Sequence, residues 1–188
     1  MAPGPAGRML LLDACCVLNF FATGRIEEIL RTLKWRSAIT AVVSGEAMWI
    51  YRGGDGEDAR ERDPVDVEPL AAIGLLEVLT PETDAETDDF VAFAALLDDG
   101  EAMTAALAMH RGAAIATDDR KARREISSRA PHITLLSTAE LLYAWSRDAA
   151  VAPAILRQAL RNVTSRAHFV PARQDLLRAW WDSATQHK

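Results

Sequence analysis

The stretch LDDGEAMTAALAMHRGAAIATDDRKAR, residues 97–123, decides the fold. Its first aspartate pair can cap the start of a helix, and Gly112 can end that helix in the left-handed conformation. The apolar residues 113–117 then predict a short buried strand, which a second aspartate pair follows at once. The segment therefore predicts a helix followed by a strand, with one pair of carboxylates just before the helix and a second pair just after the strand.

The same alternation of strands and helices runs through most of the chain. Buried strands are predicted at 9–13, 37–40, 75–79, 113–117 and 133–136. Apolar residues at helical spacing predict helices between them, including one at 41–51 that Thr40 caps. This order predicts an α/β fold with a parallel sheet and right-handed crossovers, followed by C-terminal helices at roughly 153–163 and 173–184.

A chain of 188 residues suits a single folded core. Residues 1–8, rich in proline and glycine, are predicted to be a flexible tail, and residues 9–147 the main domain. Residues 148–188 are predicted to be a helical extension. Because Trp180 and Trp181 point in different directions from one helix, this extension either packs on the domain or forms an interface, with a homodimer or a protein partner.

Charge and cysteine content limit the classes of function. The formal net charge is −6, so a polyanionic ligand would need a local basic patch or a bound cation. The two cysteines, Cys15 and Cys16, are adjacent in sequence and do not suggest a disulfide framework. The apolar run at residues 9–12 is too short for a signal peptide or a membrane span. We therefore expect a cytoplasmic protein with no membrane partner.

Five acidic residues are placed to meet at one edge of the sheet. They are Asp13, Glu46, Glu101, Asp118 and Asp119. Each alone could be a helix cap or a solvated side chain, but ligands of parallel α/β sheets bind at the carboxyl ends of the strands. Carboxylates brought together raise one another's pKa unless a cation neutralises them. Because their oxygens are hard donors and no histidine or cysteine cluster suggests zinc or iron, the expected cofactor is Mg²⁺ or Mn²⁺. Cys15 and Cys16 are expected to pack in the core and not to bind metal.

These motifs resemble the PIN-domain nucleases, especially the small VapC-type toxin ribonucleases. The resemblance covers about residues 9–145 and rests on LLDA at 11–14, SGEA at 44–47, DDGEA at 98–102 and TDDRKAR at 117–123. It implies a flavodoxin-like three-layer α/β/α fold with a parallel, PIN-like sheet, and metal-dependent cleavage of RNA. It also implies that the cation lies among Asp13, Glu46, Glu101 and an aspartate of the 118–119 pair.

Two details of the match leave alternatives open. Alignment from Thr117 favours Asp119 as the metal ligand, whereas alignment from Arg123 favours Asp118. The family often has a serine or threonine just after the first aspartate, where this chain has Ala14 and Cys15. The loss of that hydroxyl favours the alternative of a catalytically weak PIN-like module that binds RNA or protein.

The resemblance also implies a mechanism. A metal-activated water attacks phosphorus and leaves a 5′ phosphate and a 3′ hydroxyl, while Glu46 or Glu101 orients or deprotonates the water. Arg120, Lys121 and Arg123 are expected to contact substrate phosphates. The enzyme would be a hydrolase acting on RNA, and it would act as a toxin if an antitoxin protein restrains it.

A phosphoryl-receiver domain is a further α/β alternative. It is disfavoured because Asp13 has no acidic neighbour and residues 133–137 contain no lysine.

Overall fold

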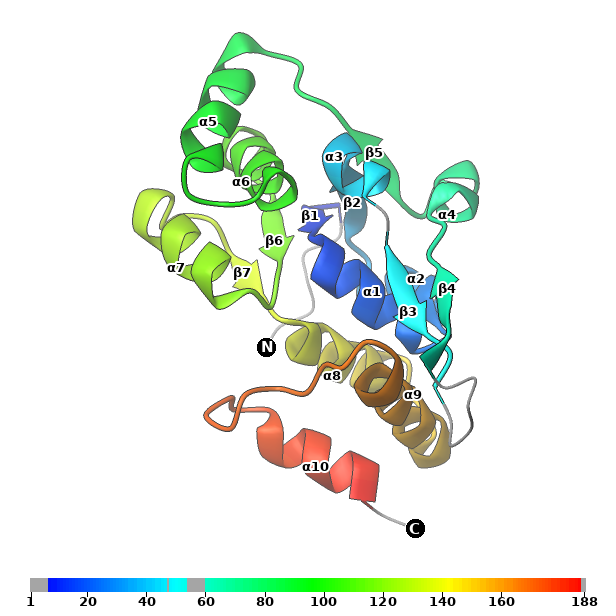
Figure 1. Ribbon diagram of the computed structural model, residues 1–188. Helices are drawn as coiled ribbons and strands as arrows, with labels where there is room; N and C mark the ends of the chain where they lie inside the picture. Colours follow the sequence, from blue (N-terminus) through cyan, green and yellow to red (C-terminus); the bar gives the residue numbers. More distant parts are fainter. Residues whose placement is uncertain (1–6, 47, 54–59, 187–188) are drawn as a thin grey trace.

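The structure is a computed structural model that describes residues 7–46, 48–53 and 60–186 (Figure 1). Within these residues a five-stranded parallel sheet forms the centre, in the order β5-β2-β1-β6-β7. Its strands are β1 (Met9–Leu12), β2 (Arg36–Thr40), β5 (Glu77–Leu79), β6 (Ala114–Ala116) and β7 (Leu135–Leu136). Helices cover both faces, so the predicted flavodoxin-like three-layer α/β/α fold is confirmed.

The chain reverses its winding direction between β1 and β6. It builds outward from β1 through β2 to β5, then returns to add β6 and β7 on the other side of β1. Leu12 pairs with Ala116, and the Asp13 amide donates to the Ala116 carbonyl over 3.0 Å. In doubly wound sheets the ligand crevice lies at such a switch point, outside the carboxyl ends of the strands. Asp13 and Thr117 are the first residues beyond those ends.

Alternate side chains of β1 enter two separate apolar cores. Leu10 and Leu12 face helices α1 (Ala14–Ala22), α2 (Ile26–Leu33), α8 (Thr138–Asp148) and α9 (Pro153–Arg166). Leu11 faces the opposite core, formed with α5 (Asp84–Ala94), α6 (Asp99–Arg111) and α7 (Arg120–Arg129). These two groups of helices are the outer layers in Figure 1.

The C-terminal helices belong to the first of these cores. Leu160 and Val163 of α9 are fully buried in it, and Trp181 of α10 (Arg178–Gln186) is 2% exposed. Trp180 is only partly buried and meets the ring of Tyr143 edge-on, with ring centroids 5.1 Å apart. Helix α10 begins at Arg178, later than the predicted residue 173.

The predicted helix at 41–51 is wrong. Helix α3 (Ala41–Gly45) ends after five residues, and β3 (Trp49–Tyr51) then pairs antiparallel with β4 (Arg62–Pro64). Aromatic and β-branched side chains favour such a strand over a helix. A further short helix, α4 (Glu68–Ala72), leads from β4 to β5.

Two other expectations concern the ends of the chain and the membrane. Residues 1–6 of the predicted flexible tail lie outside the described residues. Across the part of the chain that the structure describes, no helix has the length and apolar character needed to cross a membrane.

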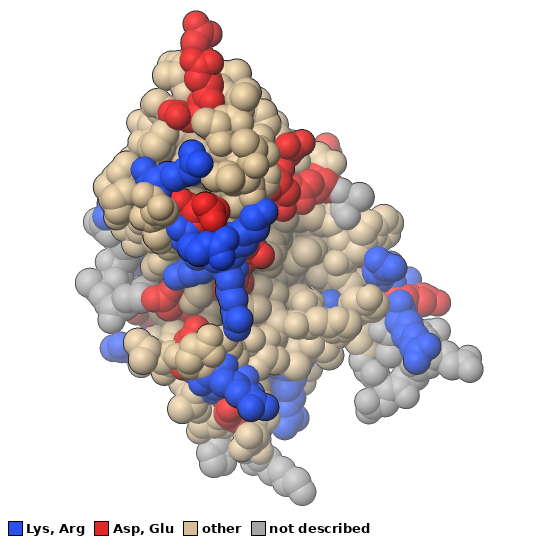
Figure 2. Space-filling view, turned by 60° about the vertical axis from the view of Figure 1, so that its left-hand side comes forward, with Lys and Arg blue, Asp and Glu red and all other residues tan. Residues whose placement is uncertain are grey.

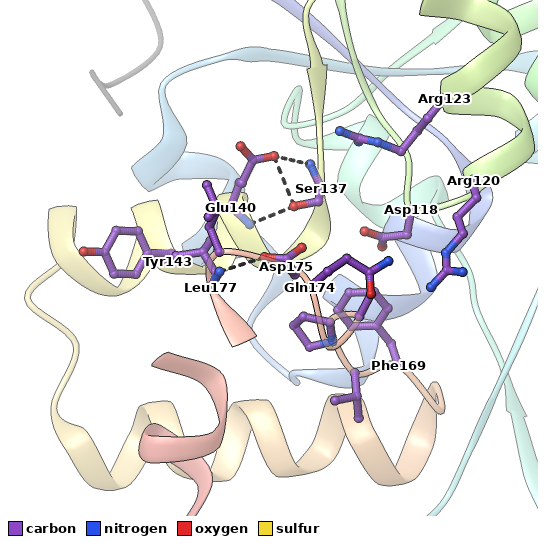
Figure 3. Close-up of a pocket in the computed structure, with 14 residues that line it drawn as sticks. Asp118, Arg120, Arg123, Ser137, Glu140, Tyr143, Phe169, Gln174, Asp175 and Leu177 are labelled. Atoms are coloured by element: carbon purple, nitrogen blue, oxygen red, sulfur yellow. Dashed lines mark hydrogen bonds between the residues drawn. The ribbon is translucent and has the colours of Figure 1, made fainter. Parts of the chain in front are cut away.

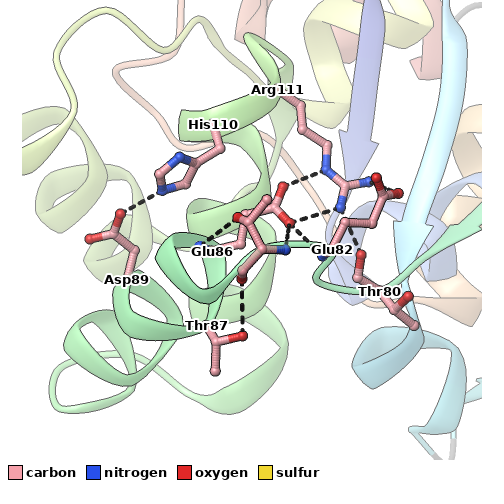
Figure 4. Close-up of polar contacts among 8 residues, drawn as sticks. Thr80, Glu82, Glu86, Thr87, Asp89, His110 and Arg111 are labelled. Carbon is pink, nitrogen blue, oxygen red and sulfur yellow. Dashed lines mark hydrogen bonds and ion pairs between the residues drawn. The ribbon is translucent and has the colours of Figure 1, made fainter.

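A buried ion pair fixes the far end of α6 (Figure 4). Arg111, in the last turn of α6, donates to Glu86 of α5 over 2.7 Å and to the Thr80 carbonyl over 2.7 Å. The hydrogen bonds from Arg111 are the main reason why the pKa of Glu86 is lowered to about 2. His110 and Asp89 add an outer contact of 2.6 Å between the same helices. This clamp holds α6 so that its first turn faces the carboxyl edge of the sheet.

Candidate functional site

Asp13 lies at the centre of the switch point and is 6% exposed. It caps α1, and its Oδ1 accepts a hydrogen bond from the Ala14 amide over 2.8 Å. Its Oδ2 accepts from the Thr117 hydroxyl over 2.8 Å and from the Cys15 thiol over 3.2 Å. Burial raises the pKa of Asp13, although these hydrogen bonds oppose the shift. The carboxylate is thus held in one orientation by the start of α1 and by the residue that follows β6.

The first turn of α6 brings two more carboxylates to this edge. Asp98 caps the helix and accepts from the Glu101 amide over 2.8 Å. Burial raises the pKa of Glu101 to about 7, and the negative charges of Asp98, Asp119 and Asp13 add to the shift. Glu101 therefore lies among three other acidic residues, in surroundings that favour its protonated form.

Glu46 also lies at this edge of the sheet, but its backbone conformation differs from the predicted one. It follows α3 as its C-cap, with an extended backbone, and is not part of a helix. A Cβ atom on Gly100 would collide with its Oε1, so the carboxylate packs directly against the α6 backbone. Burial, followed by the charges of Asp98 and Asp13, raises the pKa of Glu46.

The two aspartates after β6 face different surroundings. Asp119 caps α7, with its Oδ1 accepting from the Lys121 and Ala122 amides, and its charge acts on Glu101. Asp118 instead accepts from the Thr138 amide over 3.0 Å and from Asn19 over 3.1 Å. Burial is the main cause of the raised pKa of Asp118. Asp119 therefore acts on the side of Glu101, whereas Asp118 faces Asn19 and Thr138.

We call five of these residues the acidic cluster: Asp13, Glu46, Asp98, Glu101 and Asp119. Asp98 was not among the predicted site residues, because its position before α6 indicated only a cap. Its place three residues before Glu101 was the available signal, since a cap and the third helical residue share one end of a helix.

The oxygens of the acidic cluster are spread apart. Among the described residues, no three of these carboxylates have oxygens that all lie within 4.8 Å of one another. Direct coordination of one ion by three of these carboxylates would therefore need side-chain movement, or bridging waters of the kind that Mg²⁺ keeps.

Basic side chains gather beside the acidic cluster, on the face of the molecule that α7 occupies (Figure 2). Arg120 and Lys121 are exposed at the start of α7. Arg123 is half-buried and donates to the Thr117 carbonyl over 2.9 Å. Two of the three predicted phosphate-binding residues are thus exposed, and Arg123 also stabilises the loop that carries the aspartates.

A pocket of about 750 Å³ opens next to Asp118 (Figure 3). Arg120 and Arg123 line one side, Tyr143 of α8 lines another, and residues 169–172 and 174–177 form a further wall. Sequence reasoning missed this pocket because that wall was predicted in part as helix and lies far from the acidic motifs in the chain.

Four of the five predicted acidic residues lie in the acidic cluster, and Asp118 borders it on the side of the pocket.

No model of a known protein family, no curated protein and no solved structure matches the chain.

Proposed function

We propose that the protein is a metal-dependent ribonuclease of the PIN-domain kind, with Mg²⁺ or Mn²⁺ held by the acidic cluster. The observation that carries the proposal is the position of Glu101 among Asp98, Asp119 and Asp13 at the switch point of the sheet. Gathered carboxylates oppose folding unless a cation neutralises them, so their convergence favours a cation site. The motif resemblance adds the substrate class.

Each residue of the acidic cluster has a distinct part in this proposal. Asp13 and Asp119 would hold the ion, with Glu46 and Asp98 acting through its waters. The bound ion would make water more acidic and stabilise charge on the phosphoryl oxygens. Glu101, with a pKa near neutrality, is suited to accept a proton from the attacking water. Thr117 and Cys15 orient Asp13 through their hydrogen bonds.

Substrate contacts would come from the basic end of α7. Arg120 and Lys121 lie next in the chain to the Asp119 cap, where they would meet the phosphates that flank the scissile bond. RNA binding should therefore weaken as salt rises. A toxin role, an antitoxin partner, a homodimer and a cytoplasmic location remain predictions.

The test compares the wild type with Asp13→Asn. Asparagine caps a helix as well as aspartate does, and its amide can donate to the Thr117 hydroxyl that now donates to Asp13, so the fold should survive while the charge is lost. Metal-free protein is titrated with Mn²⁺ and then incubated with total RNA. We expect Mn²⁺-dependent cleavage by the wild type and by the control Asp88→Asn, whose position is exposed in α5. Full cleavage by Asp13→Asn would contradict the proposal.

A binding module without strong catalysis is the second candidate. The observation that favours it is the spread of the carboxylate oxygens, together with a thiol at Cys15 where the family has a hydroxyl. Binding of RNA that needs no metal, with no cleavage at saturating Mn²⁺, would select this candidate over the enzyme.

A further inference from the structure

Cys15, Cys16 and Asp118, which we call the thiol cluster, lie beside the acidic cluster and have no part in the proposed reaction beyond the Cys15 contact with Asp13. One candidate ligand atom from each lies within 4.8 Å of the others. The two sulfur atoms are 4.0 Å apart, and Cys16 Sγ is 3.7 Å from Asp118 Oδ2. In the described chain this is the one group of three or more such residues that is this compact.

These separations are close to the edges of a tetrahedral zinc site. With Zn–S bonds of about 2.3 Å and Zn–O bonds of about 2.1 Å, tetrahedral angles place two sulfurs about 3.8 Å apart and a sulfur and an oxygen about 3.6 Å apart. The observed distances of 4.0 Å and 3.7 Å differ from these values by a few tenths of an ångström at most. The third separation, between Cys15 Sγ and the Asp118 carboxylate, is at most 4.8 Å, so it would shorten by about 1.2 Å or less when the ion binds.

Each candidate ligand already has an outer partner. The Thr138 hydroxyl donates to Cys16 Sγ over 3.3 Å, and the Asp118 amide donates to Cys15 Sγ over 3.4 Å. The Asp118 carboxylate accepts from the Thr138 amide and from Asn19. Donors of this kind orient the ligands of metal sites. Cysteines that served only to pack the core would need neither these donors nor a carboxylate beside them.

We propose that Cys15, Cys16 and Asp118 bind Zn²⁺, with a water as the fourth ligand. Each thiol releases its proton to solvent as its Zn–S bond forms, so one ion displaces two protons. Cys15 then no longer donates to Asp13, whose Oδ2 keeps the hydrogen bond from the Thr117 hydroxyl. Thiolate ligands favour Zn²⁺ over the hard ions Mg²⁺ and Mn²⁺. Asp118 also lines the pocket of Figure 3, which gives the ion a path from solvent. The proposal does not depend on the protein being a nuclease.

Co²⁺ is the probe, because thiolate-to-cobalt charge transfer produces near-ultraviolet absorption that carboxylate ligands do not. We expect metal-free, reduced protein to develop this absorption until one Co²⁺ is bound per chain, and Zn²⁺ but not Mg²⁺ to abolish it. Absence of the absorption in the folded wild type would overturn the proposal, whether or not the protein cleaves RNA.

Variants then assign the ligands. Cys15→Ser, at a half-buried position, should lose most of the charge-transfer absorption, and Thr138→Val should weaken Co²⁺ binding about 10- to 100-fold by removing the hydroxyl donor to Cys16. Glu46→Gln, which changes only the acidic cluster, should leave the absorption unchanged. Circular dichroism and thermal unfolding confirm that each variant is folded. Undiminished absorption in folded Cys15→Ser would overturn the assignment.

Discussion

Glu101 makes folding depend on pH in an unusual direction for a glutamate. Its pKa is about 7 in the folded protein against an ordinary 4.5, so between these values the folded chain binds more protons than the unfolded chain. Stability should therefore fall as pH rises through this window. Glu101→Gln should remove that decline and, without divalent metal, be the more stable protein above pH 7. Urea unfolding from about pH 5 to about pH 8 in a chelator measures this.

The comparison has an internal control. Above pH 7, Mn²⁺ should reduce the difference in free energy of unfolding between the wild type and Glu101→Gln, because a bound cation offsets the repulsion among the carboxylates. Parallel stability profiles for the two proteins in the chelator would contradict the environment assigned to Glu101.

The two adjacent aspartates should respond differently to the same substitution. Asp119→Asn keeps a capping residue but removes a charge from the acidic cluster, so Mn²⁺ affinity should fall with little loss of stability. Asp118→Asn places an amide donor against the Asn19 amide or the Thr138 N–H, so it should cost about 1–3 kcal/mol of stability and leave Mn²⁺ affinity nearly unchanged. Calorimetric Mn²⁺ titration and urea unfolding of both variants give the two readouts. The reverse pattern would assign the metal to Asp118.

At the scale of elements, α3 and α6 meet where Gly100 has no side chain. An alanine there would collide with Glu46 Oε1 and approach Val43 Cγ2 to 3.3 Å. Glu46 can swing away, and alanine improves helix propensity by up to about 1 kcal/mol, so Gly100→Ala should change stability by about 1 kcal/mol or less. It should nevertheless weaken Mn²⁺ binding, because the Glu46 carboxylate leaves the acidic cluster.

Gly45→Ala is the matched control for this effect. Gly45 precedes Glu46 in the chain, but its Cβ would enter open space. Mn²⁺ titration of both variants, read beside their thermal unfolding, separates the two positions. Equal Mn²⁺ affinity for Gly100→Ala and the wild type would place Glu46 outside the metal site.

The ion pair between Glu86 of α5 and Arg111 of α6 should make the free energy of unfolding fall at acid pH. The pKa of Glu86 is lowered from 4.5 to about 2, so its contribution is complete above pH 4.5 and is lost as pH falls toward 2. Because its side chain is only 4% exposed, Glu86→Gln should cost about 3 kcal/mol near neutral pH and show less acid dependence. Asp89→Asn, at the more exposed contact to His110, should cost about 1 kcal/mol or less. Urea unfolding of both variants from neutral to acid pH measures this. Equal losses for the two variants would contradict the clamp.

Sequence pattern predicted the elements best where local chemistry sets both ends. Helix α6 begins after the Asp98 cap and ends at Gly112, whose φ is 61°, as its residues indicated. Pattern failed at 41–51, because short apolar runs do not distinguish a strand from a helix. There the outcome depends on pairing with Arg62–Pro64, which no local signal reveals.

At the scale of the whole molecule, the sequence predicted that acidic residues meet at the carboxyl edge of the sheet. It did not predict the separate surroundings of Asp118 or the pocket beside it. Parallel strands end at one edge, where the connecting helices also begin, so Asp13 after β1 and Glu101 at the start of α6 could be expected to meet there. The direction of Asp118 is decided by Thr138 and Asn19, which are remote in sequence. The pocket likewise depends on where residues 169–177 cross the molecule, which follows from packing and not from a motif.

The C-terminal helices should unfold together with the sheet, because they share its core. Trp181 is 2% exposed and packs edge-on against Phe169, with ring centroids 5.6 Å apart. Trp181→Ala should therefore cost about 3–5 kcal/mol, whereas the partly buried Trp180→Ala should cost less. Urea unfolding measures both, and hydrogen exchange should give core amides of α9 and α1 similar opening free energies. Much faster exchange across α9 and α10, with little loss in Trp181→Ala, would instead make residues 148–188 a separately folding extension.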